Sequence, residues 1–259
     1  MLLEGKIAIV SGSGPGMGRE IALALAREGA DVAVAARRED KVARVAQKIE
    51  ALGRRALAVR CDVTDPEQCQ ALADRTAAEL GGVDILVNNA YHDGDFAKVV
   101  EADLSTWQTT IDVNLFGAVN MTRAVHPHMT ERGGGRIVMV NTMSTERVET
   151  GFGIYAASKS ALKSITRTLA KELGPDGIRV NGVHPGYIWG PSVKWYFEHL
   201  AEERGVTPED VYAEVAGQNA LGYIPDAAEI ANVVLLLASD LARCVTGQAL
   251  GANAGQVFH

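Results

Sequence analysis

The chain has 259 residues, of which 47% are hydrophobic and 22% charged, and its formal net charge is −7. This length and hydrophobic content predict a single α/β domain, residues 1–259, around one large core. The acidic balance without a basic run argues against a nucleic-acid-binding surface, and no stretch of the sequence has the pattern of a secretory signal or the length of a membrane span, so we expect a cytoplasmic protein.

Short β-branched runs alternate with longer helical patterns along the chain. Strands are predicted over 6–12, 31–36, 56–63, 83–90, 136–142 and 178–185, and around 248–252. Helices are predicted over 16–28, 41–52, 66–80, 104–129 and 155–173, and near 227–238. Because apolar strands that alternate with helices are typical of a parallel sheet covered on both faces, we predict a single doubly wound α/β sheet. Its binding crevice is expected at the carboxyl ends of the strands.

The stretch SGSGPGMGRE follows the first predicted strand and opens the first helix. Gly12, Gly16 and Gly18 fit the pattern G-x-x-x-G-x-G. Glycines at these places let the backbone approach a pyrophosphate, whose charge meets the start of a helix. The alternative is a tight glycine turn that holds no ligand.

The second strand ends in Ala36, which is followed by Arg37 and Arg38. At this place an acidic residue would bind a ribose 2′-hydroxyl, whereas an arginine accommodates a 2′-phosphate. The first acidic residue, Glu39, comes too late. Arg37 therefore favours NADP over NAD. The alternative is that both arginines are solvated residues at a helix start, and for Arg38 this is the interpretation we prefer.

Tyr155 and Lys159 stand four residues apart, so they share one face of the predicted helix over 155–173. A phenol beside an ammonium group indicates acid–base chemistry, because the cation favours the phenolate. Such a pair also requires a second hydroxyl that holds the group receiving the proton. Thr142 and Ser144 are the two upstream candidates.

Seven short motifs occur along the chain in a fixed order: SGSGPGMG, CDVTD, VNNA, DVNLFG, YAASK, HPG and TGQAL. With these motifs the chain resembles the short-chain dehydrogenase/reductase family over nearly its full length. The resemblance implies a Rossmann-like fold, a homodimer or homotetramer, and hydride transfer between NAD(P) and a carbonyl or alcohol. It also implies a cofactor site made of Gly12, Ser13, Gly14, Gly16, Met17, Arg37, Asp62, Val63, Asn89, Ala90, Tyr155, Lys159 and Ile188.

Within this site the resemblance assigns separate parts. It places Asp62 and Val63 at the adenine, Asn89 and Ala90 near the nicotinamide ribose, and Ile188 near the carboxamide. It makes Tyr155 the acid–base residue and has Lys159 lower its pKa and hold the ribose hydroxyls. Asn114 would anchor a water that continues the proton relay.

The family has a serine thirteen residues before the tyrosine, and Thr142 occupies that position here. Thr142 keeps a hydroxyl that can donate to a substrate oxygen, while its methyl group narrows the site. Ser144 lies two residues further along the loop. We therefore assign the catalytic hydroxyl to Thr142 and place Ser144 among the substrate-contacting residues.

Tyr91 departs from the family pattern, which has glycine after VNNA. Its ring either reshapes the substrate pocket or turns outward. The following HDGD is predicted to be an exposed polar loop, not a metal site. The three cysteines, Cys61, Cys69 and Cys244, lack zinc-type spacing and are expected to be reduced packing residues.

The segment over 187–223, called the aromatic segment below, contains seven of the fourteen Phe, Trp and Tyr residues of the chain. Aromatic residues outside the sheet suit either an apolar lid over the substrate or a subunit contact. We favour the lid, with Trp189 and Trp195 as substrate contacts.

Together these features predict an NADP-preferring carbonyl reductase or alcohol dehydrogenase for a fairly bulky, apolar small molecule. One alternative is a 3-oxoacyl-thioester reductase, which would need a basic patch for its carrier, and no such patch stands out in the sequence. The other is a cofactor-binding regulator without turnover.

Overall fold

The structure is a computed structural model that describes residues 1–258. Within these residues seven parallel strands form one sheet in the order β3-β2-β1-β4-β5-β6-β7. The strands are β1 (Ile7–Ser11), β2 (Asp31–Ala36), β3 (Ala56–Arg60), β4 (Ile85–Asn88), β5 (Gly135–Val140), β6 (Ile178–Pro185) and β7 (Ala249–Ala252). The order reverses between β1 and β4, so the carboxyl ends of these two strands lie beside a topological switch point. The predicted Rossmann-like, doubly wound sheet is confirmed.

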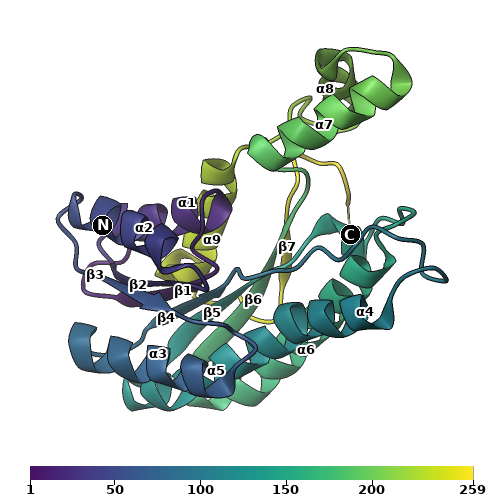
Figure 1. Cartoon of the computed structure of the whole chain (residues 1–259). Coiled ribbons are helices and arrows are strands. Elements are labelled where there is room, and N and C mark those ends of the chain that lie inside the picture. The colour runs from purple at the N-terminus through teal and green to yellow at the C-terminus, as the bar shows by residue number, and fades with distance from the viewer. Residues whose placement is uncertain (259) are drawn as a thin grey trace.

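Helices cover both faces of the sheet (Figure 1). One face packs against α1 (Met17–Arg27), α2 (Glu39–Glu50) and α9 (Ala227–Ala238). The other packs against α3 (Pro66–Leu80), α5 (Gly117–Glu131) and α6 (Gly153–Leu173), with α4 (Leu104–Ile111) just before α5. Alternate side chains of a strand enter opposite layers: Val10 lies in the first and Ile9 in the second, because successive residues point to opposite faces.

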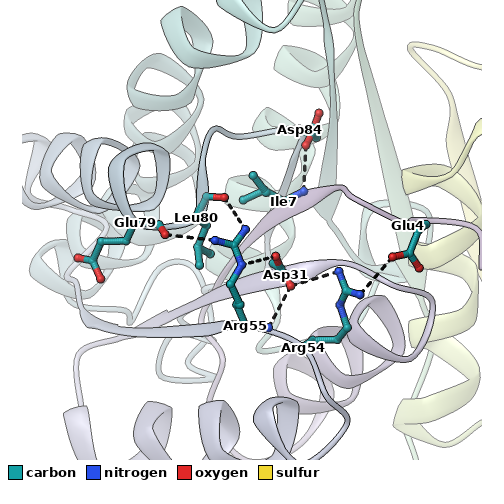
Figure 2. Close-up of polar contacts among 8 residues, drawn as sticks. All are labelled: Glu4, Ile7, Asp31, Arg54, Arg55, Glu79, Leu80 and Asp84. Atoms are coloured by element: carbon teal, nitrogen blue, oxygen red, sulfur yellow. Dashed lines mark hydrogen bonds and ion pairs between the residues drawn. The ribbon is translucent and has the colours of Figure 1, made fainter.

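Charged groups fix the amino ends of the strands, at the opposite edge from the binding crevice (Figure 2). Asp31 begins β2 and accepts hydrogen bonds from the backbone and the side chain of Arg55, at 3.0 and 2.7 Å. Arg54 lies 3.2 Å from the same carboxylate. Burial alone would raise the pKa of Asp31, but the hydrogen bonds and charges of the two arginines hold it below its usual range. This network joins β2 to the segment before β3.

The aromatic segment contains two helices, α7 (Pro191–Arg204) and α8 (Pro208–Gly217), that stand away from the sheet (Figure 1). They have a small hydrophobic core of their own, centred on Phe197, Val211 and Ile224. The base of this hairpin is closed where the Trp189 N–H donates to the Pro225 carbonyl at 2.8 Å. The sequence predicted a separate segment here, and the structure adds that it is a helical hairpin.

None of the helices formed by residues 1–258 combines the length and the apolar character that crossing a membrane requires.

Candidate active site

Two cavities lie side by side at the carboxyl ends of the strands, of about 650 and 680 Å³. The glycine loop contributes to both. The first cavity is lined by Arg37, Asp62, Val63 and Ala90. The second is lined by Gly16, Met17, Thr142, Tyr155, Lys159 and Ile188. Gly12, Asn89 and Tyr91 line both cavities, so all of the predicted cofactor and catalytic residues except Ser13 and Asn114 lie along one groove.

The glycine loop packs tightly on one side and is open on the other. Gly12 has a φ of 71°, and a Cβ placed there would lie 2.6 Å from the Ala90 nitrogen. At Gly14 and Gly16 a Cβ would meet no atom within 4 Å, and both residues line a cavity. The start of α1 has no side-chain cap. This open, uncapped helix start fits the phosphates of a dinucleotide, whose charge it would favour.

Ser13 is the one predicted residue of this loop that the structure turns away from the cavities. Its hydroxyl donates to the Val10 carbonyl at 2.6 Å, and its backbone N–H donates to the Ala35 carbonyl at 3.0 Å. The side chain is fully buried. Ser13 therefore shapes the turn and has no free donor for a ligand.

Three cations line the first cavity: Arg37, Arg38 and Lys41. Within residues 1–258 none of the three is in an ion pair or a side-chain hydrogen bond. The structure thus brings Arg38 to the cavity, although the sequence favoured a solvated residue, and it adds Lys41. The signal for Lys41 is its position three residues after Arg38 at the start of α2, which places both on one helix face.

Asp62 and Val63 form the far wall of the first cavity. The Asp62 carboxylate accepts a hydrogen bond from the Thr64 hydroxyl at 2.8 Å, and the Val63 carbonyl accepts one from Asn120 at 3.1 Å. These contacts hold the loop between β3 and α3, so the wall is preorganised for a flat ring.

Lys159 is buried deep beside Tyr155 on α6. Its Nζ donates to the Val140 carbonyl at 2.8 Å and lies 5.9 Å from the centre of the Tyr155 ring. Burial lowers the pKa of Lys159 to about 7.

Burial also raises the pKa of Tyr155, and nearby Tyr91 adds to this effect, while a hydrogen bond with Thr142 opposes it. Lys159 is not among the groups that shift the pKa of Tyr155, so the lowering that we predicted from it is not seen in the free protein. In this structure Tyr155 is protonated and placed to donate a proton.

Thr142 directly follows β5 and begins a short 3₁₀ turn, Met143–Thr145. Its Oγ1 accepts a hydrogen bond from the Ser144 N–H and donates to the Ser144 hydroxyl, both at 3.2 Å. Thr142 lines the second cavity. Ser144 lines neither cavity and instead supports Thr142 from behind. This geometry favours Thr142 over Ser144 as the hydroxyl that meets a substrate.

Asn114 lies in a π-helical turn, Asp112–Phe116, that interrupts the predicted helix over 104–129. Its amide nitrogen donates to the His92 carbonyl at 2.8 Å and to the Ser158 hydroxyl at 2.9 Å. Its oxygen accepts from the His92 N–H at 2.8 Å. Both amide hydrogens are used, so the water that we predicted can be bound only through an oxygen atom. Ser158, which the sequence analysis missed, links Asn114 to the backbone carbonyl of Tyr155 at 2.8 Å.

The clamp between Asn114 and His92 fixes the backbone beside Tyr91. The Tyr91 side chain is 57% exposed and lies where the two cavities meet. Of the two orientations left open by the sequence, the structure has the ring at the mouth of the groove. No group of three potential metal ligands occurs among residues 1–258, which include the HDGD loop.

The two tryptophans predicted to contact a substrate differ in the structure. Trp189 lines the second cavity. Trp195 is 66% exposed, stacks on His199 and lines neither cavity. Trp195 lies in α7, six residues after Trp189, and the helix presents its side chain to solvent and not to the cavity.

Three comparisons relate the chain to known proteins. A family model described as enoyl-(acyl carrier protein) reductase matches residues 12–256. The chain is 35% identical to 7alpha-hydroxysteroid dehydrogenase of Escherichia coli K12, over 98% of this chain and 95% of the relative. It is 34% identical to a 3-oxoacyl-[acyl-carrier-protein] reductase of Thermotoga maritima, over the whole of both chains. A solved carveol dehydrogenase of Mycobacterium avium, in complex with NAD, superposes with a TM-score of 0.92 at 32% identity and covers 98% of each chain.

Proposed function

Because this chain belongs to the short-chain dehydrogenase/reductase family of oxidoreductases, we propose that it transfers a hydride between NADP(H) and a carbonyl or secondary alcohol of a fairly bulky, apolar compound. One observation carries the proposal: Thr142, Tyr155 and Lys159 line a cavity that shares Gly12 and Asn89 with the cavity of the glycine loop. A proton donor and a nucleotide site thereby face the same space.

The residues divide the work as follows. Gly12, Gly14, Gly16 and Met17 receive the phosphates, Asp62 and Val63 the adenine, and Asn89, Ala90, Lys159 and Ile188 the nicotinamide half. When bound, the nicotinamide supplies or accepts the hydride. Thr142 donates a hydrogen bond to the substrate oxygen and holds it beside Tyr155. Tyr155 gives its proton to that oxygen during reduction and takes it back during oxidation. Lys159 favours the phenolate that remains, since its ammonium lies against the ring.

The preference for NADP rests on the charges around the first cavity. Ala36 leaves no carboxylate for a ribose 2′-hydroxyl, and Arg37, Arg38 and Lys41 line the cavity without ion-pair partners among residues 1–258. A 2′-phosphate would supply the missing partner. The M. avium relative is in complex with NAD, so the proposed NADP preference would distinguish this chain from that relative.

The double variant Ala36→Asp, Arg37→Ala should reverse the cofactor preference. The wild type should bind NADPH about tenfold or more tighter than NADH, since hydrogen bonds between charged groups are worth about 1.5–3 kcal/mol. The variant should bind NADH more tightly, because the new carboxylate accepts from the 2′-hydroxyl and repels a phosphate. Titration of each protein with both reduced cofactors gives the dissociation constants. Arg38→Ala alone should weaken NADPH by less than Arg37→Ala. Tighter binding of NADH by the wild type would make Arg37 a solvated residue.

A panel of ketones and secondary alcohols, assayed with both cofactors, tests the activity itself. We expect turnover of bulky apolar compounds. The panel should include a 3-oxoacyl thioester, because the T. maritima relative is named a 3-oxoacyl-[acyl-carrier-protein] reductase. A preference for the thioester would indicate that the protein is a 3-oxoacyl-thioester reductase. Tight nucleotide binding without turnover of any compound would support a regulator.

Trp189→Ala should raise the KM of a large apolar substrate by about tenfold, the loss expected when an aromatic contact is removed from a pocket. A small ketone should be affected less, because it covers less of the ring. Trp195→Ala is the matched control on the same hairpin and should leave both values unchanged within about twofold, as expected of an exposed residue. Equal effects of the two variants on KM would contradict a specific substrate contact by Trp189 and would indicate a general effect on the hairpin. A thermal melt of each variant separates loss of contact from unfolding of the hairpin, because Trp189 also packs against Tyr212.

The proposal extends to a cytoplasmic homodimer or homotetramer. The three free cysteines suit a reducing compartment. Val100 before α4, Leu104 at its first position and Phe116 at the end of the π-helical turn are exposed, and they are the apolar side chains that we propose for self-association.

A further inference from the structure

Two buried thiols lie behind the wall of the first cavity. Cys61 directly follows β3 and is itself part of the cavity wall. Cys69 lies in α3, and its Sγ donates to the Val63 carbonyl at 3.5 Å. The two thiols belong to the same buried cluster and interact with each other, and both are shielded from bulk solvent, at 2% and 0% exposure. A small molecule can reach the pair from the cavity, through Cys61.

We propose that Cys61 and Cys69 are a redox modification site: a hydroperoxide that enters the first cavity converts them to a reversible disulfide, which weakens nucleotide binding. The effect on nucleotide binding rests on the proposed function of this cavity. The chemistry of the pair does not, because it depends only on the two thiols and the opening beside Cys61.

The environment gives the two sulfurs different roles. Interaction with the Cys69 side chain lowers the pKa of Cys61, against the opposing effects of burial and of Asp62 and Asp65. The same contact and burial raise the pKa of Cys69. Cys61 is therefore the thiolate that attacks, and Cys69 is the thiol that resolves the product.

The reaction proceeds in two steps. The Cys61 thiolate attacks one peroxide oxygen, the O–O bond breaks, and the departing oxygen takes a proton and leaves as water or an alcohol. Cys61 is then a sulfenic acid. The Cys69 sulfur attacks the Cys61 sulfur, the S–O bond breaks, and the hydroxyl leaves with the Cys69 proton as water. The two thiols lose two electrons, and the hydroperoxide is reduced by two.

The new bond changes the cavity wall because it is shorter than the contact it replaces. To form the disulfide, the two neighbouring sulfurs must approach to about 2.05 Å. Cys69 can then no longer donate to the Val63 carbonyl. The bond also draws together the ends of the loop that carries Asp62 and Val63, and both residues line the cavity. A shift of about 1 Å in a binding site can cost one to two orders of magnitude.

The test treats the full-length protein with hydrogen peroxide and follows mass and nucleotide affinity together. We expect a mass decrease of about 2 Da, the loss of two hydrogen atoms. Peptide mapping should place the disulfide between Cys61 and Cys69. The dissociation constant for NADP⁺ should rise by about tenfold or more, and dithiothreitol should restore both values. Saturating NADP⁺ should slow the oxidation, because it occupies the route to Cys61.

Cys244→Ser is the matched control, since Cys244 is exposed and lies away from the cavity wall. It should behave as the wild type. Cys69→Ser keeps a donor for the Val63 carbonyl and should bind NADP⁺ normally when reduced, but it should form no internal disulfide and show no thiol-reversible loss. Oxidation confined to Cys244, or a disulfide that leaves the affinity unchanged, would overturn the proposal. A reduced wild type that binds no nucleotide would instead count against the proposed function, and the mass data would still report on the thiol pair.

Discussion

Tyr155→Phe should reduce kcat by about 10²–10⁴, the usual contribution of a general acid or base, while nucleotide affinity stays nearly unchanged. The variant removes only the phenolic oxygen. The ring keeps its place on α6 beside Lys159, so the shape of the second cavity is preserved. Burial raises the pKa of Tyr155, so the phenol is protonated in the free protein. Phenylalanine has no proton to give to the substrate oxygen.

Steady-state kinetics and a nucleotide titration on the same preparation give the two quantities. Tyr91→Phe is the matched control, because it removes a second phenolic oxygen from the mouth of the same groove. It should lose far less activity. Retention of more than a few per cent of wild-type turnover by Tyr155→Phe would refute the assignment, since a general acid contributes more than that.

Thr142→Val should lower turnover by about 10²–10³, the cost of one lost hydrogen-bond donor to a substrate oxygen. Valine is nearly isosteric, so the effect isolates the hydroxyl. Ser144→Ala should cost far less, because Ser144 lines neither cavity and acts through Thr142. Thr142→Ser should retain activity, with a gain for bulkier ketones because the methyl group is removed.

Steady-state kinetics of the three variants, with one small and one bulky ketone, show which hydroxyl binds the substrate oxygen. Thr142 also accepts the Ser144 N–H at the start of the 3₁₀ turn, so thermal melts must accompany the kinetics of Thr142→Val. If Ser144→Ala lost most of its turnover while Thr142→Val kept it, Ser144 and not Thr142 would be the donor to the substrate oxygen.

The fold could be predicted because several independent sequence features indicate the same architecture. The apolar strands, the glycine at the first turn and the capped helices agree with one doubly wound sheet. The strand over 56–63 was predicted too long, since the chain leaves the sheet after Arg60 to form the cavity wall with Cys61 and Asp62.

Side-chain direction was harder to predict than position. Ser13 lies in the glycine loop as expected, but its donors are used inside the turn. The π-helical turn at Asn114 was also missed, because residues 104–129 were predicted to form one continuous helix. The lowered pKa of Lys159 depends on burial, which a single sequence does not measure.

The α7–α8 hairpin has its own core, separate from the two layers that cover the sheet. Its base is a short crossing where Trp189 meets Pro225 and Asp226, beside which Ala220 and Leu221 donate to the carbonyls of Gly255 and Ala254. A part built in this way can lengthen, shorten or change its residues without disturbing the packing beneath the glycine loop. Descent with modification can therefore act on the two regions at different rates. Changes in the hairpin can therefore alter which compounds are accepted while the sheet and the glycine loop stay the same.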